Sequence, residues 1–172
     1  MLDYYKDIII RQYEAALCML NQCVEPCPDK VWNKSVVNLT FNQAVFHALF
    51  FTDLYLGADI ACQREQPFHK EHAATFADYE ELQPRQQVRS YSKAFITQYM
   101  AHVRSKARTV VAGETEESLQ VLMDFNWVKV ERGELHVYNI RHIQHHAAQL
   151  GLKLRMESGE GIGWVGSGWR TT

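Results

Sequence analysis

Three of the eight histidines lie close together near the carboxyl end of the chain, in residues 139–150 (NIRHIQHHAAQL). His142 and His146 stand four residues apart, so on a helix their side chains leave the same face. Two imidazoles at this spacing can bind one metal ion. Taken alone, the pair favours two surface or partly buried histidines with hydrogen-bond partners, because short motifs often match by chance. His145 lies about 100° round the helix from His146 and is predicted to face solvent or to support a ligand from outside.

His47 is the third candidate ligand, and it lies in the most apolar stretch of the sequence, between Phe46 and Ala48. A charged or unsatisfied imidazole is costly there, so by itself His47 is expected to be a core histidine that donates to a backbone carbonyl. Combined with the histidine pair on another helix, it supplies the third ligand of a three-histidine site. Three neutral imidazoles leave positions for water or substrate, as in catalytic zinc sites.

Four long stretches with helical periodicity are expected to position these histidines. They run from about Asp3 to Cys23, from the capping-box sequence at Thr40 (TFNQ) onward, from just after Pro84 to Gly113, and from near Leu135 to about Met156. Between them we expect a long crossover loop over 57–82, a short extra helix near 116–123 and a turn or brief strand pair over 126–134. The sequence therefore predicts an all-α protein, a four-helix bundle that forms one domain over residues 1–172.

The position of the site within this bundle follows from the last helix. Ile143, Ala147, Leu150 and Leu154 share one arc and are predicted to face the core, with His146 at the edge of that arc. A metal ion is therefore expected at a rim of the bundle, where the core opens to solvent. The glycine-rich tail beyond residue 158 carries two tryptophans and is expected to pack back on the domain.

Composition narrows the function classes. The 172 residues carry a formal net charge of -2, which argues against a nucleic-acid-binding surface. There is no apolar run long enough to span a bilayer and no recognisable secretory signal in the sequence, so we expect a cytoplasmic protein without a membrane partner. The spacing of Cys18, Cys23, Cys27 and Cys62 fits neither a disulfide framework nor a zinc ribbon, and reduced thiols are expected.

The layout resembles the DinB-like (DinB/YfiT) superfamily of small four-helix-bundle proteins. The matching segments are FNQAVFHALFFTDLYLG, RHIQHHAAQLGLKLR, PDKVWN and the closing GWVG, which together span nearly the whole chain. The resemblance implies a divalent metal ion (zinc, nickel, iron or manganese) held by His47, His142 and His146. Many members carry an arginine after the second histidine of the pair, where this chain has Ala147. The departure lies outside the ligand set and puts any arginine-dependent substrate contact in doubt.

The same resemblance implies a metal-dependent enzyme that activates a thiol or water for transfer to, or hydrolysis of, a small molecule. Characterised relatives include thiol S-transferases that use low-molecular-weight thiols and a thiol-dependent isomerase. Whether this chain is an enzyme, and then a thiol S-transferase or a hydrolase, stays open. The alternative is a non-catalytic metal-binding or small-molecule-sensing dimeric module. The resemblance suggests a homodimer and does not imply DNA binding.

Several further residues have open roles. Asp53 follows His47 by six residues and is a candidate to orient a ligand or act as a base, with a capping or supporting role equally open. His69 and His72 are expected to be solvated in a mobile crossover loop, and His102 and His136 have no partner at ligand spacing. The residues that flank the histidine pair as candidate hydrogen-bond donors are Tyr138, Asn139 and Gln149. The residues expected in the core or on a dimer surface are Phe50, Phe51 and Tyr55.

Overall fold

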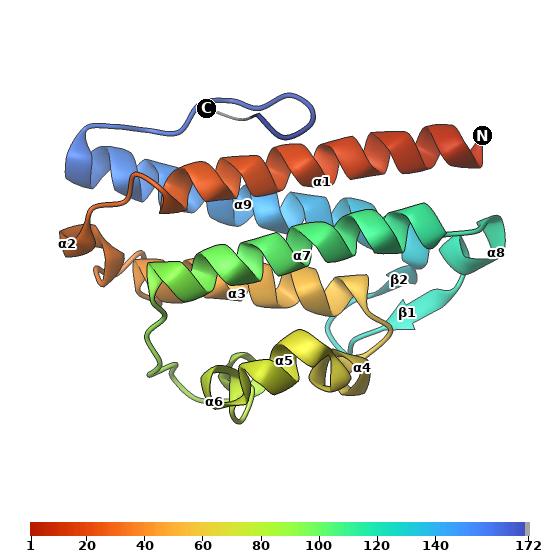
Figure 1. The fold of residues 1–172 in the computed structure, drawn as a ribbon, viewed down its shortest axis with the longest axis horizontal. Helices are drawn as coiled ribbons and strands as arrows, with labels where there is room; N and C mark the ends of the chain where they lie inside the picture. The colour runs from red at the N-terminus through yellow and green to blue at the C-terminus, as the bar shows by residue number, and fades with distance from the viewer. Residues whose placement is uncertain (171–172) are drawn as a thin grey trace.

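The long helices α1 (Leu2–Val24), α3 (Phe41–Leu56), α7 (Lys93–Gly113) and α9 (Arg132–Ser158) lie side by side in the computed structural model, which describes residues 1–170 (Figure 1). Helices α1 and α3 each pack against both α7 and α9. Fully buried side chains from all four helices, among them Leu17, Phe46, Val103 and Ile143, fill the space between them. The predicted all-α character is therefore confirmed, while positions 171 and 172 of the predicted domain lie outside the described residues.

Short elements connect the long helices. They are α2 (Asp29–Trp32), α4 (Ile60–Glu65), α5 (Pro67–Glu71), α6 (Ala73–Phe76), the 3-10 helix η1 (Glu80–Leu82), α8 (Glu116–Leu119) and the strands β1 (Leu122–Asp124) and β2 (Lys129–Glu131). The strands form a brief antiparallel pair, with Leu122 opposite Glu131. The pair begins before the predicted range of 126–134, because β1 takes up 122–124 and the extra helix expected near 116–123 ends at Leu119. The long crossover is not a plain loop, because it carries α4, α5, α6 and η1 along the outer side of α3 and α7 (Figure 1).

The ends of α3 depend on local signals. The capping box between Thr40 and Gln43 is present, and the Gln43 side chain accepts from the Thr40 N–H at 2.9 Å. The helix ends at Leu56, although the apolar pattern continues to residue 61. Asp59 caps a new helix at this point, because its carboxylate accepts from the Cys62 N–H at 2.7 Å.

The predicted start of α7 just after Pro84 is wrong, whereas its predicted end at Gly113 is confirmed. The helix begins at Lys93, where Ser92 accepts from the backbone N–H of Phe95. Residues 85–91 do not join it because their backbone groups have partners elsewhere. The Gln43 amide donates to the carbonyls of Gln87 (3.3 Å) and Arg89 (2.7 Å). These bonds hold the segment against α3 and the crossover instead.

The last helix begins at Arg132, three residues earlier than predicted. The Arg132 side chain is buried. Its guanidinium donates to the carbonyls at the carboxyl end of α3, those of Tyr55 (3.1 Å), Leu56 (2.9 Å) and Gly57 (2.8 Å). A helix leaves its last carbonyls without internal partners, so the guanidinium caps α3 from a distant part of the chain. The contact ties the start of α9 to the end of α3.

The prediction that the tail beyond residue 158 packs back on the domain is confirmed in part. It runs back along α1 (Figure 1), where Gly168 donates to the Arg11 carbonyl at 3.0 Å. Val165 is buried, and Trp169 lies 3.9 Å from the Arg104 guanidinium. Trp164 instead remains 72% exposed, so one of the two tryptophans does not pack as expected.

The structure also bears on the cysteines and on membrane-spanning helices. Cys18, Cys23 and Cys27 are buried free thiols and Cys62 is an exposed one. Among residues 1–170, no helix is both long and apolar enough to cross a membrane.

A buried polar chain joins α1, the end of α7 and α9. His136 is 1% exposed, and its Nε2 lies 3.1 Å from the Glu114 carboxylate while its Nδ1 lies 3.1 Å from the Tyr13 hydroxyl oxygen. A carboxylate only accepts, so Nε2 carries the proton and Nδ1 accepts from Tyr13. Burial lowers the pKa of His136 below its usual 6.5, with the charge of Arg132 acting in the same direction.

This pKa shift makes the free energy of unfolding depend on pH. Since the pKa of His136 is lower in the folded than in the unfolded state, its stabilising contribution is complete above pH 6.5 and declines as the pH falls below that value. The decline is at most about 1.4 kcal/mol per pH unit for one group. Urea denaturation between pH 5 and 7.5 should show a shallower dependence in His136→Gln. His145→Gln, an exposed position on the same helix, should leave the dependence unchanged, and equal slopes in all three proteins would contradict this account.

Candidate metal centre

The three predicted ligand residues converge. His47 projects from α3 and His142 and His146 from α9, and one ring nitrogen of each lies within 4.8 Å of the others. The ring centroids of His47 are 5.6 Å from His142 and 4.8 Å from His146, and those of the pair are 4.6 Å apart. A set of three imidazoles at these separations could hold one metal ion. All three residues are half-buried, so the group lies at a rim of the helical core.

The two histidines of α9 are in the form that binds metals. Burial lowers the pKa of His142 to about 2 and that of His146 to about 3, and the neighbouring imidazoles act in the same direction. Both rings are therefore neutral near pH 7 and keep a free lone pair. Their Nδ1 atoms are buried and find no hydrogen-bond partner within the described chain. Buried ring nitrogens without partners are costly, and a cation at the centre of the group fits this donor set.

Glu81, which sequence reasoning missed, fixes the third histidine. Its Oε2 lies 2.7 Å from His47 Nδ1, and its side chain is 1% exposed. The carboxylate accepts from an Nδ1–H group, so the Nε2 of His47 keeps the lone pair for a metal ion. Glu81 contacts His47 alone. Over the described residues, no carboxylate or cysteine lies within 4.8 Å of the ligand atoms of all three histidines, so the group offers three protein ligands.

Aromatic side chains line one flank of the group. The Phe51 ring centroid lies 4.7 Å from that of His47 and 5.9 Å from that of His142. Tyr55 is buried beside His142, and its hydroxyl oxygen accepts from the indole N–H of Trp127 at 2.8 Å. Tyr55 thus belongs to the core as expected, whereas the half-buried Phe51 forms part of the wall of the histidine group.

A surface groove of about 600 Å³ lies along α9 beside His142. Its lining residues are Tyr138, Arg141, His142, Gln144, His145 and Ala148. His142 therefore borders both the histidine cluster and a surface groove of a size suited to small molecules. Of the three histidines, His142 lines this groove.

The residues that flank the histidine pair have different surroundings. His145 is exposed, as predicted, and its Nε2 lies 3.0 Å from the Gln149 amide nitrogen, so Gln149 contacts His145. Asn139 is fully buried and donates to the Thr52 carbonyl at 3.0 Å, which ties α9 to α3. Tyr138 lines the groove.

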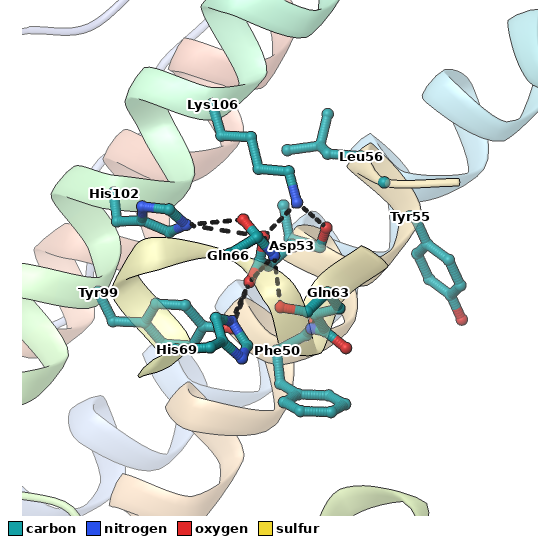
Figure 2. Close-up of polar contacts among 12 residues, drawn as sticks. Phe50, Asp53, Tyr55, Leu56, Gln63, Gln66, His69, Tyr99, His102 and Lys106 are labelled. Atoms are coloured by element: carbon teal, nitrogen blue, oxygen red, sulfur yellow. Dashed lines mark hydrogen bonds and ion pairs between the residues drawn. The ribbon is translucent and has the colours of Figure 1, made fainter. Parts of the chain in front are cut away.

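Asp53 lies in a separate polar cluster (Figure 2). Lys106 Nζ is 2.5 Å from its Oδ1, while His69 Nε2 and the Tyr99 hydroxyl lie 2.6 and 3.0 Å from its Oδ2. Burial by itself would raise the pKa of Asp53, but the nearby His102 (Nε2 3.8 Å from Oδ1), the hydrogen bond from His69 and the charge of Lys106 outweigh it. They hold the pKa well below its usual value. Asp53 is therefore a buried carboxylate that joins α3, α5 and α7.

The expectation that His69 is solvated is wrong. It is 2% exposed and stacks on Phe76, with ring centroids 3.7 Å apart. His72 is half-buried, with its ring centroid 4.5 Å from that of Phe68. His102 also has a partner, because its Nε2 lies 3.1 Å from the Gln66 amide oxygen. The crossover histidines therefore help to attach this segment to the helical core.

A comparison with protein families agrees with this structure. The model of the DinB superfamily matches residues 12–150, a range that contains all three histidines and Glu81. The chain therefore belongs to the DinB superfamily, as the sequence resemblance indicated. No curated protein and no solved structure gives a match to the chain.

The Glu81 contact predicts the tautomer of His47. In the metal-free protein, ¹⁵N NMR of the imidazoles should show His47 mainly with its proton on Nδ1, because the carboxylate accepts from that atom. Glu81→Ala should give a mixture of tautomers, whereas Glu81→Gln retains a neutral oxygen acceptor and should keep most of the Nδ1–H form. A wild-type His47 that carries its proton on Nε2 would contradict the assignment.

Proposed function

We propose that this chain binds one divalent metal ion through His47, His142 and His146 and uses it to activate a thiol or water. The observation that carries the proposal is the convergence of three imidazoles from two helices, with buried Nδ1 atoms on His142 and His146 that find no partner in residues 1–170. Imidazole ligands suit zinc, nickel and iron, and manganese is retained from the family resemblance. Three protein ligands also fit a reactive site better than a structural zinc site, which uses four.

A divalent ion held in this way would lower the pKa of a thiol or water that binds beside it and so supply a nucleophile near neutral pH. The side chains of the chain do the remaining work. Glu81 keeps His47 in one tautomer, and Phe51 and Tyr55 exclude water from one flank. The groove along α9 would admit a small electrophile, and Arg141 offers it a cation.

The wider proposal is that residues 1–172 form one domain, a four-helix bundle of the DinB/YfiT type. The packing of α1 and α3 against both α7 and α9 supports this arrangement. The proposal of a homodimer rests on the family resemblance. A low-molecular-weight thiol as co-substrate rests on the same resemblance, and thiol transfer and hydrolysis are the two reactions to be compared.

Metal content tests the ligand assignment. Elemental analysis of the purified protein should give about one divalent metal ion per chain, because three imidazoles and an open position make one site. His47→Ala and His146→Ala should each lose most of the metal, since a change at a neighbouring residue alone costs about 10- to 100-fold in affinity. His145→Ala is the matched control, one position from a ligand but exposed, and should keep the wild-type content. Equal metal content in all four proteins would exclude the site.

Turnover can be tested with monochlorobimane and either glutathione or L-cysteine. In this reaction a carbon–sulfur bond forms, the carbon–chlorine bond breaks, chloride leaves and the thiol proton passes to solvent. Protein loaded with zinc or manganese should exceed the rate with the same ion alone by at least about tenfold, or about 1.4 kcal/mol of barrier. His146→Ala should abolish the increase and His145→Ala should retain it. Metal binding without acceleration of thiol transfer or ester hydrolysis would favour a non-catalytic metal-binding module.

A further inference from the structure

Glu81 lies in a three-residue helix that is too short to fix its position without contacts from elsewhere. It belongs to the 3-10 helix η1, which spans Glu80–Leu82 at the end of the crossover. Its Oε2 contacts His47, and its Oε1 is buried with no partner among the described residues. One contact with a histidine ring does not hold a carboxylate in a single position. The backbone on each side of Glu81 must therefore be held by other contacts.

The contacts on the amino side converge on Tyr79. This residue has a left-handed backbone (φ 56°, ψ 58°), and Ala77 shortly before it also has a positive φ of 37°. Positive φ is unfavourable for residues other than glycine and persists only when surrounding contacts impose it. Such contacts are present, because the Tyr79 hydroxyl oxygen lies 2.6 Å from His69 Nδ1 and Arg64 lies 4.7 Å over the Tyr79 ring.

The direction of the hydrogen bonds in this chain can be worked out. Asp53 accepts at Oδ2, so the Nε2 of His69, 2.6 Å away, carries a proton and donates. A neutral imidazole has one donor and one acceptor, which leaves the Nδ1 of His69 as acceptor for the Tyr79 O–H. Asp53 in turn is held by Lys106 of α7 (Figure 2). The chain from Tyr79 through His69 to Asp53 therefore anchors the end of the crossover to α3 and α7.

A second anchor is made by Glu80, the residue directly before Glu81. The buried carboxylate of Glu80 accepts from the backbone N–H groups of Val88 and Arg89, and its Oε2 lies 3.2 Å from the Arg89 guanidinium. These contacts fix residues 80 and 88–89 relative to one another. The Gln43 amide ties residues 87 and 89 to α3, while the Tyr79 contact ties the residues just before Glu81 to α3 and α7 through His69 and Asp53. Both contacts therefore set the distance between Glu81 and His47.

We propose that Tyr79 is a positioning residue for the histidine group. Its hydroxyl is held by His69 and Asp53, and its backbone places Glu81, which contacts His47. It holds Glu81 where its carboxylate keeps the proton of His47 on Nδ1 and the lone pair on Nε2. The benefit to metal binding rests on the proposed function. The effect of Tyr79 on the tautomer of His47 does not, because it is expected in the metal-free protein as well. In this proposal the crossover orients His47, the candidate metal ligand on α3.

The test compares two variants that each remove one tyrosine hydroxyl: that of Tyr79, which reaches Asp53 through His69, and that of Tyr99, which contacts Asp53 directly. Tyr79→Phe removes the hydroxyl that donates to His69 Nδ1 but keeps the aromatic ring beside Phe50, whose ring centroid is 5.6 Å away. Tyr99→Phe is the matched control, because its hydroxyl also ends at Asp53 Oδ2 but comes from α7. Imidazole ¹⁵N NMR of the metal-free proteins should show mixed His47 tautomers in Tyr79→Phe and the wild-type Nδ1–H form in Tyr99→Phe. Competition with a chelator should show zinc affinity lowered about tenfold or more in Tyr79→Phe alone.

A double-mutant cycle separates positioning from a general loss of stability. If Tyr79 acts through Glu81, Tyr79→Phe combined with Glu81→Ala should bind zinc no more weakly than Glu81→Ala alone. Additive losses, an unchanged His47 in Tyr79→Phe, or an equal change in Tyr99→Phe would each overturn the proposal.

The wild-type protein provides a further check that does not depend on the folding of any variant. The ¹⁵N shifts of His69 should show its proton on Nε2, and a proton on Nδ1 would overturn the hydrogen-bond direction and with it the proposal. Absence of zinc binding by the wild type would reject the proposed function while the tautomers of His47 and His69 still test this inference.

Discussion

The antiparallel packing of α3 against α9 is the contact on which the rest of the structure depends. One residue of rotation in α9 would turn His142 and His146 by about 100° away from His47. Two buried contacts hold the register. Arg132 donates to the last carbonyls of α3, and the Asn139 amide donates to the Thr52 carbonyl. These bonds lie on the same side of α9 as the histidine pair, so the register that satisfies them also brings the pair to His47.

Neutrality is the second condition of the histidine group. Three imidazoles in one half-buried corner could not all carry a proton, because each charge would be poorly solvated and close to the others. The low pKa values of His142 and His146 express this cost. Buried neutral nitrogens without internal partners are costly, and a cation would satisfy their lone pairs without adding a donor. The same burial that makes the metal-free group costly therefore favours metal binding.

Buried carboxylate–histidine–tyrosine chains occur at two places in the described structure. Glu114, His136 and Tyr13 join the end of α7, α9 and α1, while Asp53, His69 and Tyr79 join α3 and the crossover. In each, an acceptor-only carboxylate sets the tautomer of a neutral histidine, which then accepts from a phenol. The first chain ties core helices together. The second instead fixes an irregular segment, and it lies two residues from the carboxylate that contacts a candidate ligand.

The sequence by itself determined those features that depend on neighbours in the chain. Helical periodicity gave the long helices, the Thr40–Gln43 capping box gave the start of α3, and four-residue spacing placed His142 and His146 on one face. The third histidine followed from the family resemblance, whose motifs are contiguous. Tertiary structure decided the rest. The start of α7, the burial of His69 and the role of Glu81 all rest on bonds between residues far apart in sequence, such as the contact of Glu81 with His47 across 34 positions. Local propensity carries no information on such bonds, because they form only once the crossover has folded against α3 and α7.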